Sequence, residues 1–442
     1  MTKRSFQASR AANGSEAWQR LYFDHPYLTR FTAQVVERPE QAGRPAVVLD
    51  QTAFYPTGGG QPHDTGVLKA LDADNGTAER LVAVVEVVER EADGAVIHLL
   101  AAPLDAEQVE GRIDWDRRFD LMQQHTGQHL LSAAFVRCCG ANTVSFHLTT
   151  SCATIDLDCA LTEEELTQAE ALANRVVFEN RPVAARLVPG KEAQHLPLRK
   201  ATARSGPVRI VEVPDFDCSA CGGTHVRATG EIGLIKIVHT ERRGTETRVE
   251  FVCGRRALAD YQVKNTILLD MARDLSVGYW EVPEAVRRLD AELRDARREL
   301  RRADDALLDA EASALWHGAD LVDDVRVVQA YLPGHAPDRL KLLARRLIAQ
   351  PQTAVLLGAG QTGDKGHLVF ARSADVELHA GELLGEACRL IGGRGGGRPD
   401  FAQGGGPDGA QVPAALDAAL ATLSSTIKLI ADGRRPEPEA PA

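Results

Sequence analysis

Between residues 20 and 110, hydrophobic residues occur in short runs that turn residues interrupt. The runs are RFTAQVVERP, RPAVVLDQTAFYP, LVAVVEVVER and AVIHLL. Short apolar runs bounded by turn residues are typical of strands, and no part of this region requires a long helix. We therefore predict a small β-barrel over residues 20–110, with a sandwich as the related alternative. Residues 1–19 are predicted to be a disordered lead-in.

The segment TAFYPTGGGQPHDTG lies inside this region and places Gly58, Gly59 and Gly60 side by side. Glycine allows backbone angles and close approaches that a Cβ atom would block. A hairpin turn is the ordinary explanation for three glycines alone.

From residue 114 to about residue 138, hydrophobic residues recur at helical spacing, and Gly140 provides a suitable end for that helix. Segments around residues 144–148 and 153–157 are typical of strands. In the segment LTEEEL, Thr162 and Glu165 form a capping box at the start of a second helix. This mixture predicts an α+β domain over residues 111–255.

Residues 282–314 carry hydrophobic residues at alternating spacings of four and three, which is the heptad pattern of a coiled-coil seam. Arginines and acidic residues on the other faces nearly cancel, so a solvated helix surface is favoured over a track for RNA. The seam requires a partner helix. The preceding segment RRALADYQVKNTILLDMARDL can fold back onto it, and a homodimer through residues 282–314 is the alternative. We predict a helical coiled-coil linker over residues 256–316.

The last part of the chain alternates strand-like and helix-like segments and contains a glycine-rich loop. This alternation predicts a compact C-terminal α/β domain over residues 317–433. The proline-rich tail, residues 434–442, is predicted to be disordered. The whole chain is thus predicted to be a multidomain α+β protein.

Composition limits the possible settings and partners of the chain. Its 442 residues are more than one ordinary domain needs, and a net charge of −11 argues against indiscriminate nucleic-acid binding but not against a locally basic groove. Eight cysteines in so long a chain do not resemble a secreted disulfide framework. There is no apolar run of membrane-spanning length and no hydrophobic leader, so we expect a cytoplasmic protein with no membrane partner.

Two short stretches carry side chains that bind metal ions. MQQHTGQHL places His125 and His129 one helical turn apart, so both imidazoles can share an ion, although such a pair alone is weak evidence. DCSACGGTH adds Cys221 and His225, and a thiolate with imidazoles suits Zn²⁺. We predict a zinc site built from His125, His129 and Cys221, with His225 as the fourth ligand or a close neighbour.

Cys218 leaves a second arrangement open, because CSACG also resembles a zinc knuckle that uses Cys218 and Cys221 in a structural site. A structural site is normally closed by four protein ligands, whereas a catalytic site keeps one position for water or substrate. We favour the catalytic arrangement.

The segments QHTGQHLLSAAF, DFDCSACGGTH and TGEIGLIKIV resemble the editing domain of alanyl-tRNA synthetases and its free-standing relatives, the AlaX proteins. TAFYPTGGGQPHDTG resembles the glycine-rich motif of the small barrel that precedes this domain in the family. GGRGGGRPDFAQGGG, residues 392–406, is similar to the DHH-associated domain that ends the synthetases and the long AlaX proteins. The resemblance covers nearly the whole chain. Since the sequence begins directly at the barrel, without an aminoacylation domain, we do not expect it to charge tRNA.

The resemblance implies an enzyme, a zinc-dependent aminoacyl-tRNA deacylase whose partner is tRNA(Ala) mischarged with serine or glycine. Such a site must accept serine and spare alanine, which lacks only the hydroxyl. A purely apolar pocket discriminates poorly in that direction. Thr143, in ANTVSFHL, matches a pocket threonine of AlaX proteins, and a plain strand residue is the alternative. Gly58, Gly59 and Gly60, with the weaker candidate Gln61, are expected at the edge of the site near the acceptor end.

The RNA itself must also be held. A phosphate path near the editing domain is one candidate, lined by Arg112, Arg117, Arg118, Arg242, Arg243 and Arg248. In the C-terminal domain, Arg394 and Arg398 can bind RNA phosphates or stack on bases. A nucleotide-phosphate loop is the alternative there, but the Lys-Ser/Thr ending of a P-loop is missing. The alternative to an enzyme is a non-catalytic tRNA-binding protein with a structural zinc ion.

Overall fold

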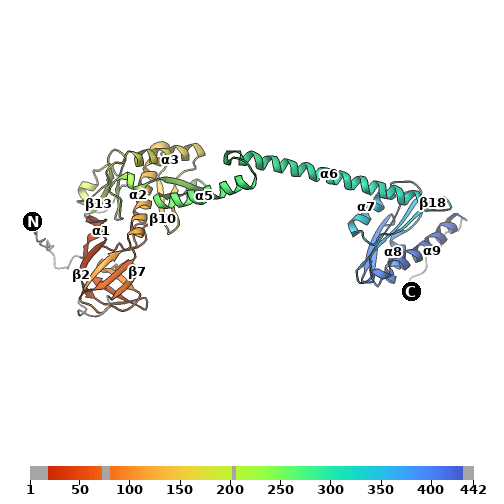
Figure 1. Cartoon of the computed structure of the whole chain (residues 1–442), viewed down its shortest axis with the longest axis horizontal. Helices are drawn as coiled ribbons and strands as arrows, with labels where there is room; N and C mark the ends of the chain where they lie inside the picture. The colour runs from red at the N-terminus through yellow and green to blue at the C-terminus, as the bar shows by residue number, and fades with distance from the viewer. Residues whose placement is uncertain (1–17, 72–79, 202–205, 432–442) are drawn as a thin grey trace, which may run out of the picture. The chain divides into compact units, whose positions relative to one another are not determined.

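The computed structural model describes residues 18–71, 80–201 and 206–431, and Figure 1 shows the course of the chain. The chain separates into two compact units, residues 1–274 and residues 275–442. The predicted tail and most of the predicted lead-in lie outside the described residues. The predicted disorder is wrong for Gln19, which pairs with Gln51 in a short parallel strand contact.

The first unit begins with a closed β-barrel. Its main strands are β2 (Arg30–Glu37), β4 (Arg44–Leu49), β6 (Gly66–Ala70), β7 (Leu81–Glu89), β8 (Val96–Leu100) and β9 (Gln108–Ile113). They pair in the order β2-β9-β6-β7-β8-β4, and β2 also pairs with β4, which closes the sheet. Along β2, alternate residues such as Phe31 and Val35 point into the barrel core, as the strand period requires. The closure confirms the predicted barrel rather than the sandwich. Shorter elements accompany these strands: β1 (Gln19–Arg20), α1 (Leu21–Asp24), β3 (Glu40–Gln41) and β5 (Gln51–Thr52).

The rest of the first unit is organised around helix α2 (Trp115–Cys139), which lies close to its predicted bounds. Asp114 caps its start by accepting a hydrogen bond from the backbone N–H of Arg117, and Gly140 ends it in the left-handed conformation, with a φ of 66°. The residues in the middle of α2 are buried on every side. The helix is therefore the centre of this domain rather than a surface cover.

Helix α3 (Glu163–Phe178) packs against α2 and begins with the predicted capping box of Thr162 and Glu165. Two antiparallel sheets complete the domain, in the orders β10-β11-β16-β15 and β12-β13-β14. Their strands are β10 (Thr143–Leu148), β11 (Ala153–Leu157), β12 (Ala184–Val188), β13 (Val208–Val213), β14 (Asp217–Ala220), β15 (Ile235–Arg243) and β16 (Glu246–Cys253). Helix α5 (Gly254–Asp274) packs on α2, β15 and β16, and the short helix α4 (Gly190–Ala193) follows β12.

A buried ion pair fastens the barrel to the α2 domain. Arg118 on α2 and Asp64 in the glycine-rich barrel segment are both fully buried, and the guanidinium contacts both carboxylate oxygens. Arg118 also donates to the backbone carbonyls of Pro26 at 2.9 Å and Ala53 at 2.5 Å. Removing one partner of such a pair typically costs about 3–5 kcal/mol, because the other charge is left buried without a counterion. The predicted role of Arg118 in a phosphate path is therefore wrong.

The second unit begins with the long helix α6 (Val282–His317) and contains a mixed sheet in the order β17-β18-β19-β20-β22-β21. The remaining elements are β17 (Asp320–Val322), β18 (Val325–Tyr331), α7 (Pro337–Leu347), β19 (Thr353–Ala359), β20 (Gly366–Arg372), α8 (Ala380–Leu390), β21 (Arg394–Gly397), β22 (Phe401–Gly406) and α9 (Val412–Ala431). Helices α8 and α9 share one core with the sheet, and α6 and α7 share another with its opposite face. This mixture of strands and helices confirms the predicted C-terminal α/β arrangement, whose exact bounds stay a prediction.

The glycine-rich segment at residues 392–406 is not a loop, contrary to the prediction. It forms β21 and β22, which pair with each other, and β22 also pairs with β20. A Cβ atom at Gly404 would overlap the sulfur of Cys388 on α8, so the bare strand lets that helix lie close against it. Close packing thus explains glycine in a strand, where its flexibility would otherwise be unfavourable.

Helices α5 and α6 fall in the predicted linker, residues 256–316, but the division between the two compact units runs between them. Their pairing as a coiled coil, and the homodimer through residues 282–314, therefore stay predictions. No helix in the described part of the chain combines the length and the apolar character that a membrane span requires.

Candidate metal centre and substrate pocket

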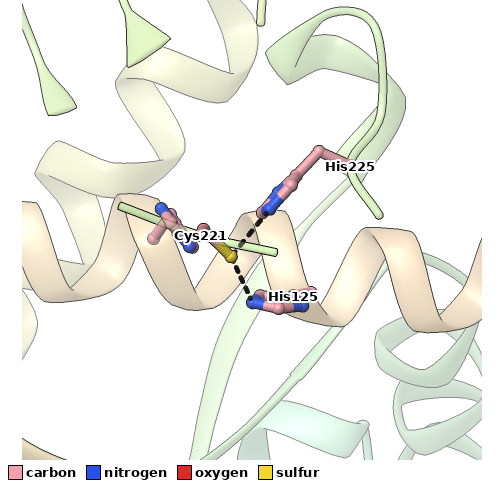
Figure 2. Close-up of side chains that lie close together, drawn as sticks. His125, Cys221 and His225 are labelled. Atoms are coloured by element: carbon pink, nitrogen blue, oxygen red, sulfur yellow. Dashed lines mark hydrogen bonds between the residues drawn. The ribbon is translucent and has the colours of Figure 1, made fainter. Parts of the chain in front are cut away.

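Four side chains from two parts of the first unit converge at one point. His125 and His129 lie on α2, while Cys221 and His225 lie just after β14. Their ligand atoms are all within 4.8 Å of one another. The Cys221 sulfur is 3.3 Å from Nε2 of both His125 and His225, as Figure 2 shows. A single ion can therefore reach all four residues.

Local sequence explains how the loop reaches the helix. The spacing of four residues turns His125 and His129 towards the same side of α2. A Cβ atom at position 223 would overlap the imidazole of His125, so Gly223 lets the chain pass directly over this ring. Arg209 on β13 donates to the carbonyls of Cys221 at 3.0 Å and Gly223 at 2.9 Å, which fixes the loop in place.

The barrel contributes directly to the orientation of His125. Nδ1 of His125 donates to Oε1 of Gln61 at 2.8 Å, since an amide oxygen can only accept. The Gln61 side chain is itself fixed by Thr224, whose N–H donates to Oε1 at 3.1 Å and whose hydroxyl accepts from Nε2 at 2.8 Å. With Nδ1 protonated, the lone pair on Nε2 of His125 faces Cys221.

His129 is oriented by a carboxylate. Its Nδ1 donates to Oδ2 of Asp217 at 2.9 Å. Arg199 donates to Oδ1 of the same carboxylate at 2.8 Å, and the Ser219 hydroxyl donates to it as well. A carboxylate behind a histidine is a common way to hold a metal-binding ring and to increase its basicity.

His225 is held in the same tautomer. The Thr126 hydroxyl donates its single hydrogen to the carbonyl oxygen of Met122, at 2.8 Å. Its oxygen therefore accepts from Nδ1 of His225, at 3.1 Å. All three imidazoles thus have Nδ1 occupied and direct Nε2 to the common centre, which is the arrangement that a shared metal ion requires.

The electrostatics of the group favour a thiolate. Burial raises the pKa of Cys221, but His125 and His225 outweigh burial and bring that pKa well below the ordinary value. Burial lowers the pKa of His225 to about 3, so this ring is neutral. Burial also lowers the pKa of His129, but Asp217 and Cys221 outweigh it and raise that pKa to about 9. The thiolate is the form of cysteine that binds metal ions.

Cys218 does not join this group. It lies on β14 and packs beside the small hydrophobic cluster of Val188, Val208 and Ile210. Burial raises the pKa of its thiol, which opposes the thiolate form that a ligand needs. The geometry therefore favours the His125, His129, Cys221 and His225 set over the knuckle, with Cys218 outside it.

A cavity of about 770 Å³ opens beside the four residues. Its lining includes Thr143 and Gln128 next to His125, His129 and Cys221. The Ser132 hydroxyl links two of these residues: it lies 2.6 Å from the Thr143 hydroxyl and accepts from Nε2 of Gln128 at 2.8 Å. Four cationic side chains also line the cavity: Arg20, Arg199, Lys200 and Arg209.

The glycine-rich segment reaches this cavity as a tight turn. Gly58 and Gln61 exchange backbone hydrogen bonds of 3.1 and 2.9 Å, and Gly59 and Gly60 between them have positive φ values of 57° and 82°. Of the three glycines, Gly59 lines the cavity, whereas a Cβ atom at Gly60 would meet the Phe146 ring at 2.7 Å. Gln61 is fully buried behind His125 and is not part of the cavity wall. The substrate role of the glycines stays a prediction, while the position of Gln61 favours support of His125.

The predicted RNA-binding residues Arg248, Arg394 and Arg398 are not among the residues that line the cavity. Arg248 on β16 pairs with Asp156 at 2.6 and 2.8 Å. Arg394 is exposed on β21, and Arg398 follows that strand and pairs with Asp400 at 3.1 Å, in the other compact unit. Their contact with RNA stays a prediction.

Sequence reasoning missed several residues of the site, namely Gln128, Ser132, Arg199, Arg209 and Asp217. Gln128 lies in the motif MQQHTGQHL and Asp217 in the motif DCSACGGTH. Their position next to the proposed ligands in the sequence could have indicated that they belong to the site. Arg199 and Arg209 carried no such signal, because only the fold brings them to the site.

Comparisons with known proteins agree with this architecture. Residues 208–250 match the domain family described as the threonyl and alanyl tRNA synthetase second additional domain, and residues 324–428 match the DHHA1 domain. The alanine–tRNA ligase of Pyrococcus abyssi is 33% identical over 91% of this chain, and that of Thermococcus kodakarensis is 36% identical over 87%. The chain spans only 43% and 41% of these two ligases. The alanyl-tRNA editing protein AlaX-L of Pyrococcus horikoshii is 30% identical over 87% of this chain and 94% of its own length.

The metal centre can be tested by removing one cysteine at a time. We expect the purified protein to bind close to one metal ion per chain, and Cys221→Ala to lose it because the only thiolate of the group is gone. The matched control, Cys218→Ala, should keep the metal. Elemental analysis of the two variants gives the answer, and the opposite pattern would move the site to the knuckle.

The support of His125 by Gln61 predicts a graded loss of metal affinity. Gln61→Ala removes the acceptor of the Nδ1 proton, so the affinity for Zn²⁺ should fall about 10- to 100-fold in competition with a chelator. Gln61→Glu keeps an acceptor at that position and should retain most of the affinity. Thermal melts of both variants would check the fold. Equal zinc affinity in Gln61→Ala and the unchanged protein would refute the role.

Proposed function

Because the chain belongs to the family of alanyl-tRNA editing proteins that includes AlaX-L, we propose that it hydrolyses mischarged tRNA(Ala) in trans. The bond broken is the ester between the 3′ end of the tRNA and a wrong amino acid, serine or glycine. The observation that carries this proposal is the convergence of three Nε2 atoms and one thiolate beside an open, partly cationic cavity.

The residues present fit a zinc ion. Imidazole nitrogen and thiolate sulfur are its usual protein ligands, and each of the three rings has its Nδ1 in a hydrogen bond, which leaves Nε2 directed to the common centre. When bound, zinc can lower the pKa of a water molecule or hold the amino or ribose group of the substrate. We propose that His125, His129 and Cys221 hold it. His225 is then either the fourth ligand or a nearby residue that does not bind, so that one coordination position stays open for water or substrate.

The cavity offers the positioning that ester hydrolysis needs. An aminoacyl ester is already activated, so the protein must mainly orient the reacting groups and stabilise the developing negative charge. Lys200, Arg199 and Arg209 line the wall of the cavity and favour the anionic end of a tRNA. Gly59 leaves bare backbone at the rim, where the acceptor end would approach.

Selection of serine over alanine is assigned to the Thr143 hydroxyl. It lies on the cavity wall, and its hydrogen bond to Ser132 fixes its position while leaving further bonding capacity. A polar group that bonds the serine hydroxyl discriminates in its favour by about 1–3 kcal/mol, because alanine leaves it unpaired.

The direct test is deacylation of tRNA(Ala) charged with serine, glycine or alanine. We expect the purified protein to hydrolyse the seryl or glycyl ester, or both, well above the uncatalysed rate and to leave the alanyl ester largely intact. The measurement is the loss of labelled amino acid from the tRNA over time. Binding of tRNA(Ala) without any hydrolysis would instead identify a non-catalytic tRNA-binding protein.

Thr143→Val keeps the shape of the side chain and removes its hydroxyl. The ratio of kcat/KM for Ser-tRNA(Ala) to that for Ala-tRNA(Ala) should fall about 5- to 100-fold, in line with the loss of one selective hydrogen bond. Thr154→Val, on the neighbouring strand β11 and outside the cavity wall, is the matched control. A ratio that stays at its original value in Thr143→Val would leave Thr143 with a structural role only.

A further inference from the structure

Helix α6 exposes a long stretch of its surface. Within the second unit it packs on α7 and β18, and its buried residues near that end are Leu308 and Ala312. Every residue from Val286 to Leu307 is exposed. Figure 1 shows this part of α6 leading away from the C-terminal sheet as one continuous helix. About six turns of helix are therefore free to contact a partner.

The charges of this stretch are segregated, although their sum is close to zero. At about 100° of rotation per residue, one face of roughly a third of the circumference collects the following arginines: Arg287, Arg294, Arg297, Arg298 and Arg301. Between residues 287 and 301, Asp290 is the one acidic residue on that face, and Asp305 lies on it one turn further along the helix. The acidic residues Glu284, Glu292, Asp295 and Glu299 fall on another face, together with Arg288 and Arg302. The hydrophobic seam lies between the two faces.

The arginines of this face, which we call the arginine face, are weakly neutralised. Arg294 pairs with Asp290 at 2.6 Å and Arg298 pairs with Asp295, but these side chains are 73% and 69% exposed, so both pairs are worth little in water. In the described part of the chain, no acidic partner is found for Arg287, Arg297 or Arg301. Four of the five border a single recess of about 550 Å³, so their positive charges are concentrated.

We propose that the arginine face of α6 binds the phosphate backbone of the tRNA substrate. The cations of this face are all arginine, which binds phosphate through two parallel hydrogen bonds, and α6 contains no lysine. From residue 287 to residue 301 the helix rises about 21 Å, enough to follow several phosphates along one strand. The positive face stands out against the chain's net charge of −11. The identity of the RNA rests on the proposed function, whereas the binding of phosphate backbone does not.

Pairing of α6 with another helix would not explain this face. Arg287, Arg294 and Arg301 recur every seven residues. With the hydrophobic seam at heptad positions a and d, these three arginines fall at position b, whereas the residues that flank the seam of a coiled coil are at positions e and g. Arg297 is the member that occupies a flanking position. A partner on the seam would therefore leave most of the arginine face open, so homodimerisation and RNA binding are compatible.

The test compares two double variants of the full chain that remove the same charge from different faces of α6. Arg297→Gln with Arg301→Gln alters the arginine face, and Arg288→Gln with Arg302→Gln alters the acidic face. Glutamine preserves the helix, because its helix propensity is close to that of arginine. The probe is uncharged tRNA(Ala), so binding is measured without any hydrolysis, over a series of salt concentrations.

We expect the arginine-face variant to reduce the slope of log affinity against log salt by about 1.4–1.8, the loss of two phosphate contacts. The acidic-face variant should keep the original slope. In deacylation, KM should rise in the arginine-face variant while kcat at saturating tRNA stays unchanged, since these residues lie in the other compact unit from the metal centre.

Equal slopes of log affinity against log salt in the unchanged protein and the arginine-face variant would overturn the proposal. An equal reduction of this slope in the arginine-face and acidic-face variants would overturn it as well. An altered oligomeric state with an unchanged slope would identify the face as a protein contact and would overturn it too. If the unchanged protein bound tRNA but hydrolysed nothing, and the arginine-face variant still lost its slope, the proposed enzyme would fail while this inference would stand.

Discussion

The hydrogen bond from His125 to Gln61 is the contact on which the site depends, because it joins two domains at the metal centre. Gln61 is held in a tight glycine turn of the barrel, and three residues later Asp64 forms the fully buried ion pair with Arg118. The same short segment therefore anchors the barrel to α2 and orients the His125 ring of the candidate metal site on that helix. A barrel that only covered the active site would not need either contact. This explains why the barrel and the α2 domain form one compact unit.

The sequence predicted those features that depend on local periodicity and on side-chain chemistry. The start and end of α2 follow from Asp114 and Gly140, and the capping box of α3 follows from Thr162 and Glu165. The convergence of His125, His129, Cys221 and His225 follows the prediction, because helical spacing and a glycine-containing loop limit where these side chains can point. The supporting contacts could not be found in this way. Gln61 and His125 are separated by 64 positions, and His129 and Asp217 by 88, so only the fold brings each pair together.

Errors in the sequence predictions share a physical cause, which is that residue type does not reveal burial. Arg118 has the charge expected of a phosphate contact, yet it is fully buried against Asp64. The glycines at residues 392–406 have the composition of a loop, yet they form strands because α8 lies close against them. In each case the spatial neighbours of the residue decide its role.

The central claim is that one zinc ion, held by His125, His129 and Cys221 with His225 beside them, makes this protein an editing enzyme. The most direct measurement is titration of the chelator-treated protein with zinc while deacylation of mischarged tRNA(Ala) is followed. The account predicts negligible hydrolysis without metal and a rise in rate that reaches its plateau at about one zinc ion per chain. Full activity in the metal-free protein, or stoichiometric zinc binding without any hydrolysis, would contradict it.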